Sequence, residues 1–317
     1  MALSSKNPGK WTVVDSEHMP ARHVAMRTLR QRLAEVWAWL PKACSERQRD
    51  PESVHQLRVA TRRALAALEA FRNLLPQKQV AWFEKQLRRI RRAASDARDL
   101  DVLTDRLAAT AQPEATGPRP PTGKARARLV AMLSKQRESS CQPIRERHEK
   151  LLERDWAGRL ERLLENLPAG RQQATFGTYA RHRFRPMIRR FFAVADHRLR
   201  NAEELHELRI EGKKLRYAME IFACVFPPAV RVRCTDALER LQKTLGDFTD
   251  HASAADRFRR WANDKSALAN RDTLERLQRE EESLADEARR NFSNWWSPTR
   301  RRGLMQRFER TLHRDSA

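Results

Sequence analysis

Glycine is scarce in this 317-residue chain, which contains only nine. Runs of β-branched residues that alternate with polar ones are almost absent as well. Both absences argue against β-sheet, which needs period-two patterns bounded by turn residues. Leu, Ala, Arg, Glu and Gln dominate instead, and these residues favour helices. The composition therefore predicts an all-α fold.

Cysteine motifs and long apolar runs are also missing. The cysteines show neither CxxC pairing nor the spacing of metal ligands, which predicts reduced thiols and no bound metal or cofactor. Nothing at the N-terminus resembles a signal peptide. No stretch approaches the ~20 apolar residues needed to span a bilayer. We therefore expect a soluble cytoplasmic protein with four free cysteines, Cys44, Cys141, Cys224 and Cys234.

Acidic residues are outnumbered, because 64 Lys and Arg stand against 41 Asp and Glu and give a formal charge of +23. The excess positive side chains repel one another in the folded chain unless a polyanion neutralises them. Nucleic acid, an anionic membrane and an inorganic polymer all meet this requirement. Charge alone does not choose among them.

One segment of the chain occurs twice. A shift of 151 positions aligns about fifty residues without a gap, which is typical of a duplicated folding unit. A functional site is therefore expected where two copies act together. The aligned pairs include His55 with His206, Arg58 with Arg209, Glu69 with Glu220, Phe71 with Phe222, Pro76 with Pro227, Leu87 with Leu238, Asp96 with Asp247, and Asp99 with Asp250.

Helical periodicity extends over most of the chain. Helices are expected near residues 20–42, 52–75, 77–110, 124–167 with an interruption at Pro143, 173–199 with a kink at Pro186, 202–226, 229–263, 265–292 and 301–315. Proline and glycine predict a loop over 112–123 and a domain boundary over 167–170. We expect a tail over 1–19 that trails over the surface, a first half over 20–168 and a second half over 169–317. Each half should pack about four long helices into a bundle.

Two polar stripes follow the apolar faces of the repeated helices. In each copy, apolar residues recur at spacings of three and four, as on the buried face of a helix. Cationic or titratable residues lie about 100° further round the same helices. Cations stacked along the edge of a buried face are costly unless an anion meets them, so the stripes predict an anion site. The stripe residues are His55, Arg58 and Arg62 in the first copy and His206, Arg209, Lys213 and Arg216 in the second.

Two alternatives remain open for these residues. The arginines could form an ordinary solvated surface of a basic protein, although their occurrence in both copies favours a binding site. The histidines could be structural residues at the helix starts, since Glu52, Ser53, Glu203 and Glu204 occupy positions of helix caps and first-turn acids.

More basic residues follow on the neighbouring helices, together with acids that repeat. The acids are candidate metal ligands, but their place beside arginines favours a role in orienting those arginines. The added basic candidates are Arg27, Arg30, Arg88, Arg91, Arg92, Arg181 and Arg185, and the repeated acids are Asp96, Asp99, Asp247 and Asp250.

These residues resemble the motifs of a known family. The segments HQLRVATRR (55–63) with LEAF (68–71), and HELRIEGKKLRY (206–217) with MEIF (219–222), resemble the two signature helices of the conserved histidine α-helical domain family, CHAD. The segment SDARDLDV (95–102) resembles the downstream motif of that family. The resemblance covers about residues 20–300. It implies two four-helix bundles related by a pseudo-two-fold axis, with a basic groove or pore where the signature helices meet.

The family binds inorganic polyphosphate and tends to be found at polyphosphate granules. The sequence departs from the family pattern at Leu65, where the second copy has Arg216, and at Thr249, which replaces an arginine equivalent to Arg98. The resemblance implies the ligand-facing positions His55, Arg58, Arg62, Arg63, His206, Arg209, Lys213, Lys214 and Arg216.

Polyphosphate suits these residues because it is a flexible anion without bases, so it needs arginine and lysine at helical pitch rather than aromatic stacking platforms. Non-specific nucleic-acid binding is the alternative, since a chain of charge +23 attracts DNA and RNA at low salt. A polyphosphate hydrolase is a second alternative, but it would need Mg²⁺ held by clustered carboxylates. We therefore expect a binding protein without catalytic residues, in which both copies contribute to binding.

Overall fold

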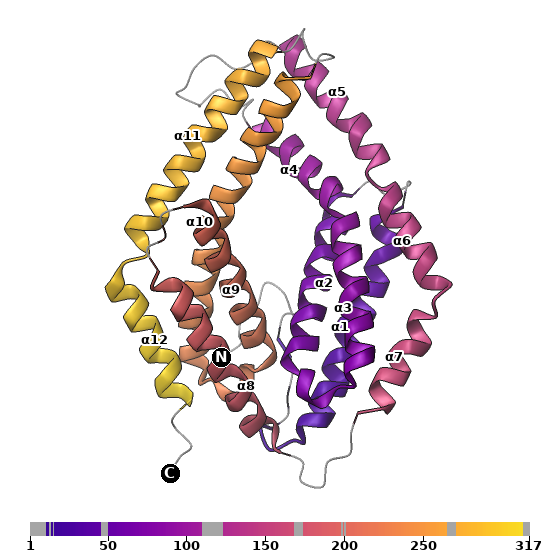
Figure 1. Cartoon of the computed structure of the whole chain (residues 1–317), viewed down its shortest axis with the longest axis vertical. Coiled ribbons are helices and arrows are strands. Elements are labelled where there is room, and N and C mark those ends of the chain that lie inside the picture. Colours follow the sequence, from indigo (N-terminus) through magenta and orange to yellow (C-terminus); the bar gives the residue numbers. More distant parts are fainter. Residues whose placement is uncertain are drawn as a thin grey trace. The chain divides into compact units, whose positions relative to one another are not determined.

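The computed structural model describes residues 11–12, 14, 16–45, 50–109, 123–167, 174–197, 199, 201–264 and 271–312 (Figure 1). These residues form helices and no β-strand, which confirms the all-α prediction. The chain divides into two compact units. We call Met26–Pro168 the first-copy unit, and Ala169–Ala317 together with Met1–Ala25 the second-copy unit.

The described residues of the first-copy unit form most of α1 and six further α-helices. The helix α2 packs against α3 and α4, α3 packs against α6 and α7, and α4 packs against α5. The elements are α1 (Ala21–Ala43), α2 (Pro51–Ala70), the 3-10 helix η1 (Arg72–Leu74), α3 (Gln77–Ala93), α4 (Ser95–Ala109), α5 (Gly123–Ser139), α6 (Gln142–Leu152) and α7 (Trp156–Glu165).

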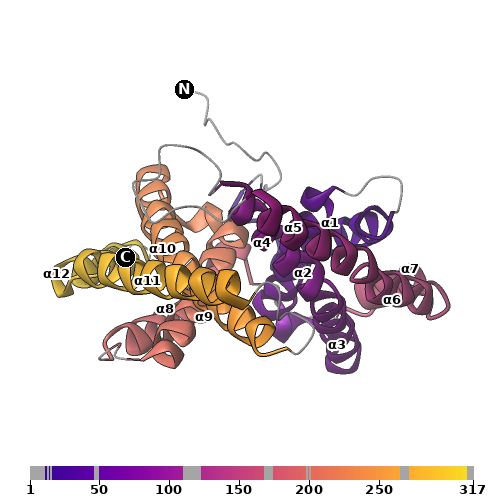
Figure 2. The ribbon, with the colours of Figure 1, turned by 90° about the horizontal axis from the view of Figure 1, so that it is seen from above.

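The second-copy unit is built around a long antiparallel pair of helices, α10 and α11, which lie side by side in two views (Figures 1 and 2). The helix α9 passes close to α10 at Gly212, where an added Cβ would lie 3.0 Å from a methyl carbon of Leu241. The elements are α8 (Phe176–Ala195), α9 (Ala202–Ile221), the 3-10 helix η2 (Ala223–Val225), α10 (Pro228–Ala262), α11 (Arg271–Trp295) and α12 (Pro298–Leu312).

The repeated helices α2 and α9 begin at side-chain caps. Asp50 caps α2 by accepting from the backbone N–H of Glu52, and Asn201 forms a capping box with Glu204 at α9. The N-caps are therefore Asp50 and Asn201, and His55 and His206 each lie one turn beyond the start of their helix. A structural role of another kind for these histidines stays open.

Several helix boundaries differ from the sequence expectation. The helix expected over 77–110 ends at Ala93 and restarts at Ser95, whereas α10 continues through the equivalent point of the second copy. The helix expected over 124–167 is three helices, with a second break at Asp155, whose φ is 53°. The helix α8 contains Pro186, where a kink was predicted, and continues beyond it. Residues 112–122 and 168–170, where a loop and a boundary were predicted, lie outside the described residues.

The N-terminal segment does not trail over the surface where the structure describes it. Thr12 is buried and donates its backbone N–H to the carbonyl oxygen of Glu220 at 2.9 Å. The carbonyl of Met19 accepts from Phe176 at 2.7 Å, and Glu17 pairs with Arg181 at 2.9 Å. The expectation failed because an extended segment held by backbone hydrogen bonds carries no helical period.

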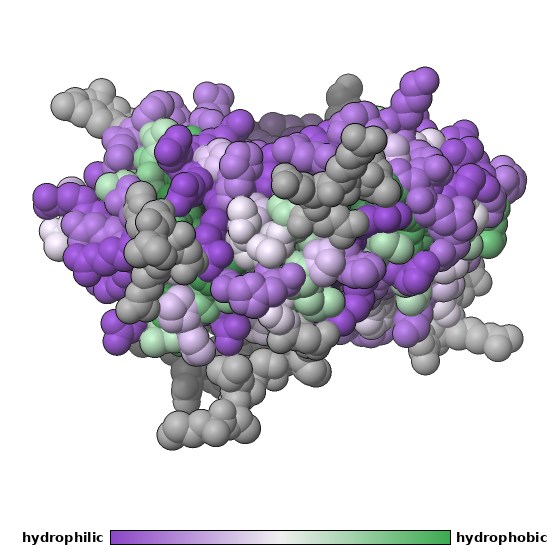
Figure 3. Space-filling model, turned by 90° about the horizontal axis from the view of Figure 1, so that it is seen from below, coloured by the Kyte–Doolittle hydropathy of each residue, from purple (hydrophilic) through white to green (hydrophobic). Residues whose placement is uncertain are grey.

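The surface of the protein is mainly hydrophilic in the view of Figure 3, with hydrophobic residues in small, scattered areas. This agrees with the charged fraction of 33%. Within the described ranges, no helix is long and apolar enough to cross a bilayer.

Candidate polyanion-binding site

Three helices of the first-copy unit bring five basic side chains together. Residues 55, 58 and 62 share one edge of α2 because spacings of three and four each make about one helical turn. The break at Ala94 separates α3 from α4, so that arginines on both helices act electrostatically on those of α2. We call this set the cationic cluster: His55, Arg58 and Arg62 on α2, Arg91 on α3, and Arg98 on α4.

Arg58 is the best anchored member of the cationic cluster. Its Nη1 donates to the carbonyl oxygen of Arg91 at 3.2 Å and to Oγ of Ser95 at 3.0 Å. Burial and the neighbouring Arg62 lower the pKa of Arg58, while Asp99 opposes this shift. The guanidinium is thus held in place among like charges, an arrangement that an external anion would relieve.

Arg62 and Arg91 extend the cationic cluster along α2 and α3. The Nε of Arg62 is enclosed and makes no hydrogen bond to any described residue. Burial, followed by Arg62 and Arg88, lowers the pKa of Arg91. A buried donor without an acceptor is costly, so Arg62 favours a bound oxyanion.

His55 is half-buried at the N-terminal end of the cationic cluster. Burial is the main cause that lowers its pKa, followed by the charge of Arg98. Arg62 and Arg58 lower the pKa further, and Glu52 is the acid that opposes them. His55 is therefore neutral at pH 7 in the free protein, since its pKa lies below the usual value of about 6.5.

The equivalent residues of the second-copy unit are more closely matched by acids. Arg209 lies 3.9 Å from Asp250, and its guanidinium passes over Gly246, the position equivalent to Ser95. Lys214 pairs with the buried Glu211 at 2.6 Å. His206 is exposed rather than half-buried. The two stripes are therefore related by sequence, but their local charge balance differs.

Arg216 is mainly an internal ion-pair partner. It contacts Glu220 at 2.6 Å, donates to Gln242 at 2.9 Å and lies over the ring of Tyr217. In the first copy, Glu69 is equivalent to Glu220 but pairs with Arg72, one turn further along. The departure at Leu65 thus removes an ion-pair partner of Glu69, and Arg72 replaces it.

The structure distributes the other predicted basic residues over several surfaces. Arg30 pairs with Glu161 at 2.6 Å, Arg181 pairs with Glu17, and Arg185 donates to the carbonyl oxygen of Leu312 at 2.8 Å. Arg88 pairs with Glu84 at 3.0 Å beside the cationic cluster. Arg27, Arg92 and Arg63 lie on α1, α3 and α2, with Lys213 on α9, and their place in the site stays a prediction.

Sequence reasoning left Arg98 out of the site. The signal was present, because Arg98 stands in the downstream motif between Asp96 and Asp99. Arg98 also follows Arg91 by seven positions, which places both on nearly the same face of the continuous helix expected over 77–110.

The repeated acids fall into two groups. Asp99 raises the pKa of Arg58, and Asp250 lies 3.9 Å from Arg209. That these acids orient the two arginines stays a prediction. Asp96 and Asp247 are exposed. The described residues contain no group of three His, Cys, Asp or Glu side chains placed to hold a metal ion.

The fold and the cationic cluster define an all-α domain with arginine-rich repeated helices. A family model described as the CHAD domain matches residues 27–259, so the chain belongs to the CHAD domain family. This confirms the resemblance seen in the repeated segments.

Two solved structures share the fold. The crystal structure of the CHAD domain from the plant Ricinus communis is 20% identical, with a TM-score of 0.68 over 91% of this chain and 97% of that chain. PptA from Streptomyces chartreusis is 18% identical, with a TM-score of 0.57 over 87% and 99% respectively. No curated protein matches the chain.

Proposed function

We propose that this protein binds inorganic polyphosphate and that the cationic cluster is its principal contact. The observation that carries the proposal is the gathering of four arginines and a histidine whose mutual repulsion and burial lower the pKa values of His55, Arg58 and Arg91. A chain of phosphates offers a negative charge on every unit, and the guanidinium fork binds phosphate oxygens in pairs.

Several features favour polyphosphate over nucleic acid. The aromatic rings with described contacts pack mainly against one another, as Phe184 does against Phe222, Phe226 and Phe308. The cationic cluster itself contains no aromatic residue on which a base could stack. Membership of the CHAD family supports the same choice, and we extend the proposal to residence at polyphosphate granules.

The proposal predicts selective binding at physiological salt. At about 150 mM salt, long-chain polyphosphate should bind more tightly than single- or double-stranded DNA at the same phosphate concentration, because half-buried cations are screened less than exposed ones. Titrations followed by calorimetry at several salt concentrations measure this. Equal or tighter binding to DNA at that salt would favour the nucleic-acid alternative.

Binding should also take up a proton at His55. A polyanion offsets the charge of Arg98, Arg62 and Arg58, so the pKa of His55 should rise on binding and affinity should increase as the pH falls through that range. NMR titration of the histidine ring protons with and without polyphosphate measures the shift. In the His55→Gln variant, this pH-dependent part of the affinity should disappear, and its persistence would assign the proton to another group.

We further propose that the protein binds polyphosphate without cleaving it. With Mg²⁺ or Mn²⁺ present, purified protein should leave the polymer length unchanged on gels and release no phosphate from ATP. The Asp99→Ala variant should bind polyphosphate more weakly, because Arg58 loses the acid that orients it. Metal-dependent phosphate release that is lost in Asp99→Ala would instead identify an enzyme.

A further inference from the structure

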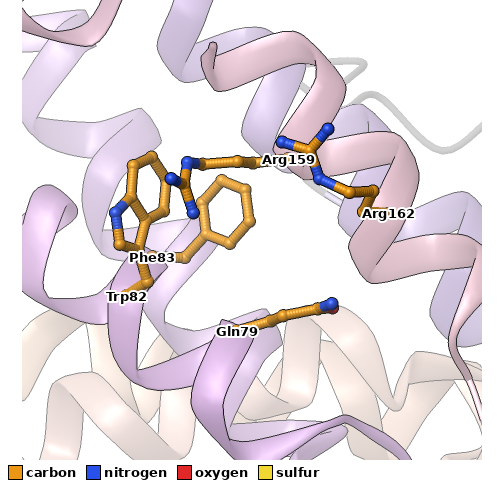
Figure 4. A pocket seen from close by; sticks show the side chains of 5 residues that line it. All are labelled: Gln79, Trp82, Phe83, Arg159 and Arg162. Carbon is orange, nitrogen blue, oxygen red and sulfur yellow. The ribbon is translucent and has the colours of Figure 1, made fainter. Parts of the chain in front are cut away.

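A hollow on the first-copy unit has no part in the proposed function. It offers about 260 Å³ of open space and is lined by Gln79, Trp82 and Phe83 of α3 and by Arg159 and Arg162 of α7 (Figure 4). Gln79 precedes Arg88 by nine positions on this helix, and Trp82 precedes Arg91 by nine. Nine positions correspond to about two and a half turns, so the two residues of each pair point in opposite directions. The hollow therefore lies on the face of α3 opposite to the cationic cluster.

The arginines of the hollow are held by their neighbours. Arg159 lies over the ring of Trp82, 4.6 Å from its centroid, and its Nε donates to the carbonyl oxygen of Arg154 at 2.9 Å. Arg162 donates to Asp155 at 3.0 Å, an exposed pair that an external anion can share or displace. Little side-chain freedom is therefore lost at Arg159 when an anion binds, whereas Arg162 exchanges part of its contact with Asp155 for the anion.

Gln79 supplies a third polar group. Gln79 of α3 and Arg162 of α7 both line the hollow (Figure 4). The Oε1 of Gln79 makes no hydrogen bond to any described residue. Because Oε1 is enclosed, we expect the NH₂ of this amide to be the group that donates to an oxygen of the ligand.

The wall behind these groups is rigid. Trp82 meets Phe83 edge to face at 4.9 Å, Phe83 meets Trp156 at 5.0 Å, and Trp156 stacks on Trp37 at 5.9 Å. The second copy has Val230, Arg233 and Cys234 at the positions of Gln79, Trp82 and Phe83. The hollow therefore does not belong to the duplicated helix pattern.

We propose that this hollow binds a phosphate group, either as free orthophosphate or as the terminal phosphate of a short chain. Two guanidinium groups that line one hollow suit an anion that carries about −1.5 to −2 charges near neutral pH better than a singly charged carboxylate. The site is separate from the cationic cluster and would let the protein bind the monomer as well as the polymer.

The test is a calorimetric titration of the full chain with orthophosphate at constant ionic strength and about pH 7, with acetate as the carboxylate comparison. Orthophosphate should bind more tightly than acetate. The Arg159→Gln/Arg162→Gln variant should lose about tenfold or more in orthophosphate affinity, as expected for charge-assisted hydrogen bonds. The Arg128→Gln/Lys150→Gln variant removes the same charge from exposed positions of α5 and α6 and should bind like the parent.

Two further arms separate the sites and the sources of phosphate. The orthophosphate affinity of the Arg58→Glu/Arg62→Glu variant should equal that of the parent, because both substitutions lie in the cationic cluster. In this variant, a tripolyphosphate affinity equal to that for orthophosphate would identify a terminal phosphate as the ligand. Binding of orthophosphate without binding of tripolyphosphate would identify the free ion. Unchanged orthophosphate affinity in Arg159→Gln/Arg162→Gln, or no binding by the parent at millimolar concentrations, would overturn the proposal.

Discussion

The double reversal Arg58→Glu/Arg62→Glu should weaken long-chain polyphosphate binding by at least about 100-fold. Each arginine loses charge-assisted hydrogen bonds of about 1.5–3 kcal/mol, and each glutamate adds repulsion toward the phosphates. Both residues are half-buried between α2, α3 and α4, where salt screens charge less than at an open surface. Calorimetry at about 150 mM salt measures the loss, and circular dichroism checks that helical content is kept.

The matched control changes the same charge elsewhere in the same unit. Arg128→Glu/Lys150→Glu also lowers the net charge by four, but at exposed positions outside the cationic cluster. Its effect should be about threefold or less, because screening limits long-range attraction. Equal losses in both double variants would mean that overall charge, and not the cationic cluster, determines binding.

The second-copy stripe can be tested in the same way. Arg209→Glu/Lys213→Glu should weaken the binding of long chains, because a flexible polymer that engages both copies gains affinity from each. Short oligophosphates, which engage one cluster at a time, should lose less. If long chains bind this variant like the parent, the idea that both copies contribute is wrong.

The variant Glu220→Ala should lower the free energy of unfolding by about 3 kcal/mol, at the lower end of the range for breaking a buried ion pair. The side chain of Glu220 is 2% exposed and that of its partner Arg216 is 14% exposed. Without Glu220, the Arg216 guanidinium stays largely buried, although its hydrogen bond to Gln242 offsets part of the cost. Urea denaturation followed by fluorescence measures the change.

The repeat provides the control for this prediction. Glu69 occupies the equivalent position, but its side chain is 50% exposed and that of Arg72 is 34% exposed, so Glu69→Ala should cost no more than about 1 kcal/mol. Replacing both buried partners, as in Glu220→Leu/Arg216→Met, should recover most of the lost stability. A loss in Glu220→Ala no larger than in Glu69→Ala would show that burial does not set the cost of this pair.

The helical fold and most helix positions could be predicted because they depend on local periodicity. Apolar residues such as Leu57 and Leu68, and Leu208 and Met219 in the second copy, recur at helical spacing and are all buried. The break at Ala94 could not be predicted, since neither glycine nor proline marks it. Packing of α2 against both α3 and α4 accompanies it instead.

Part of the candidate site required the three-dimensional contacts. The stripe on α2 follows from spacing alone, but the inclusion of Arg98 depends on the packing of α4 against α2. Sequence also could not distinguish the arginines that face solvent from those that pair internally. Arg216, Arg181 and Arg185 have partners 4, 164 and 127 positions away, and the two distant partners have no sequence signal.

The attachment of the N-terminal segment to the second-copy unit has a consequence for how the chain is made. Residues 12, 17 and 19 leave the ribosome first, yet the groups they bind on α8 and α9 follow about 150 to 200 residues later at roughly 5–20 residues per second. The first-copy unit is thus inserted in sequence between the two parts of the second-copy unit. It can fold before the N-terminal segment has its partners on α8 and α9. A fragment that starts at Ala169 would lack this segment, whereas an internal deletion that joins Pro20 to Thr175 through a short linker would keep these contacts within one continuous stretch of chain.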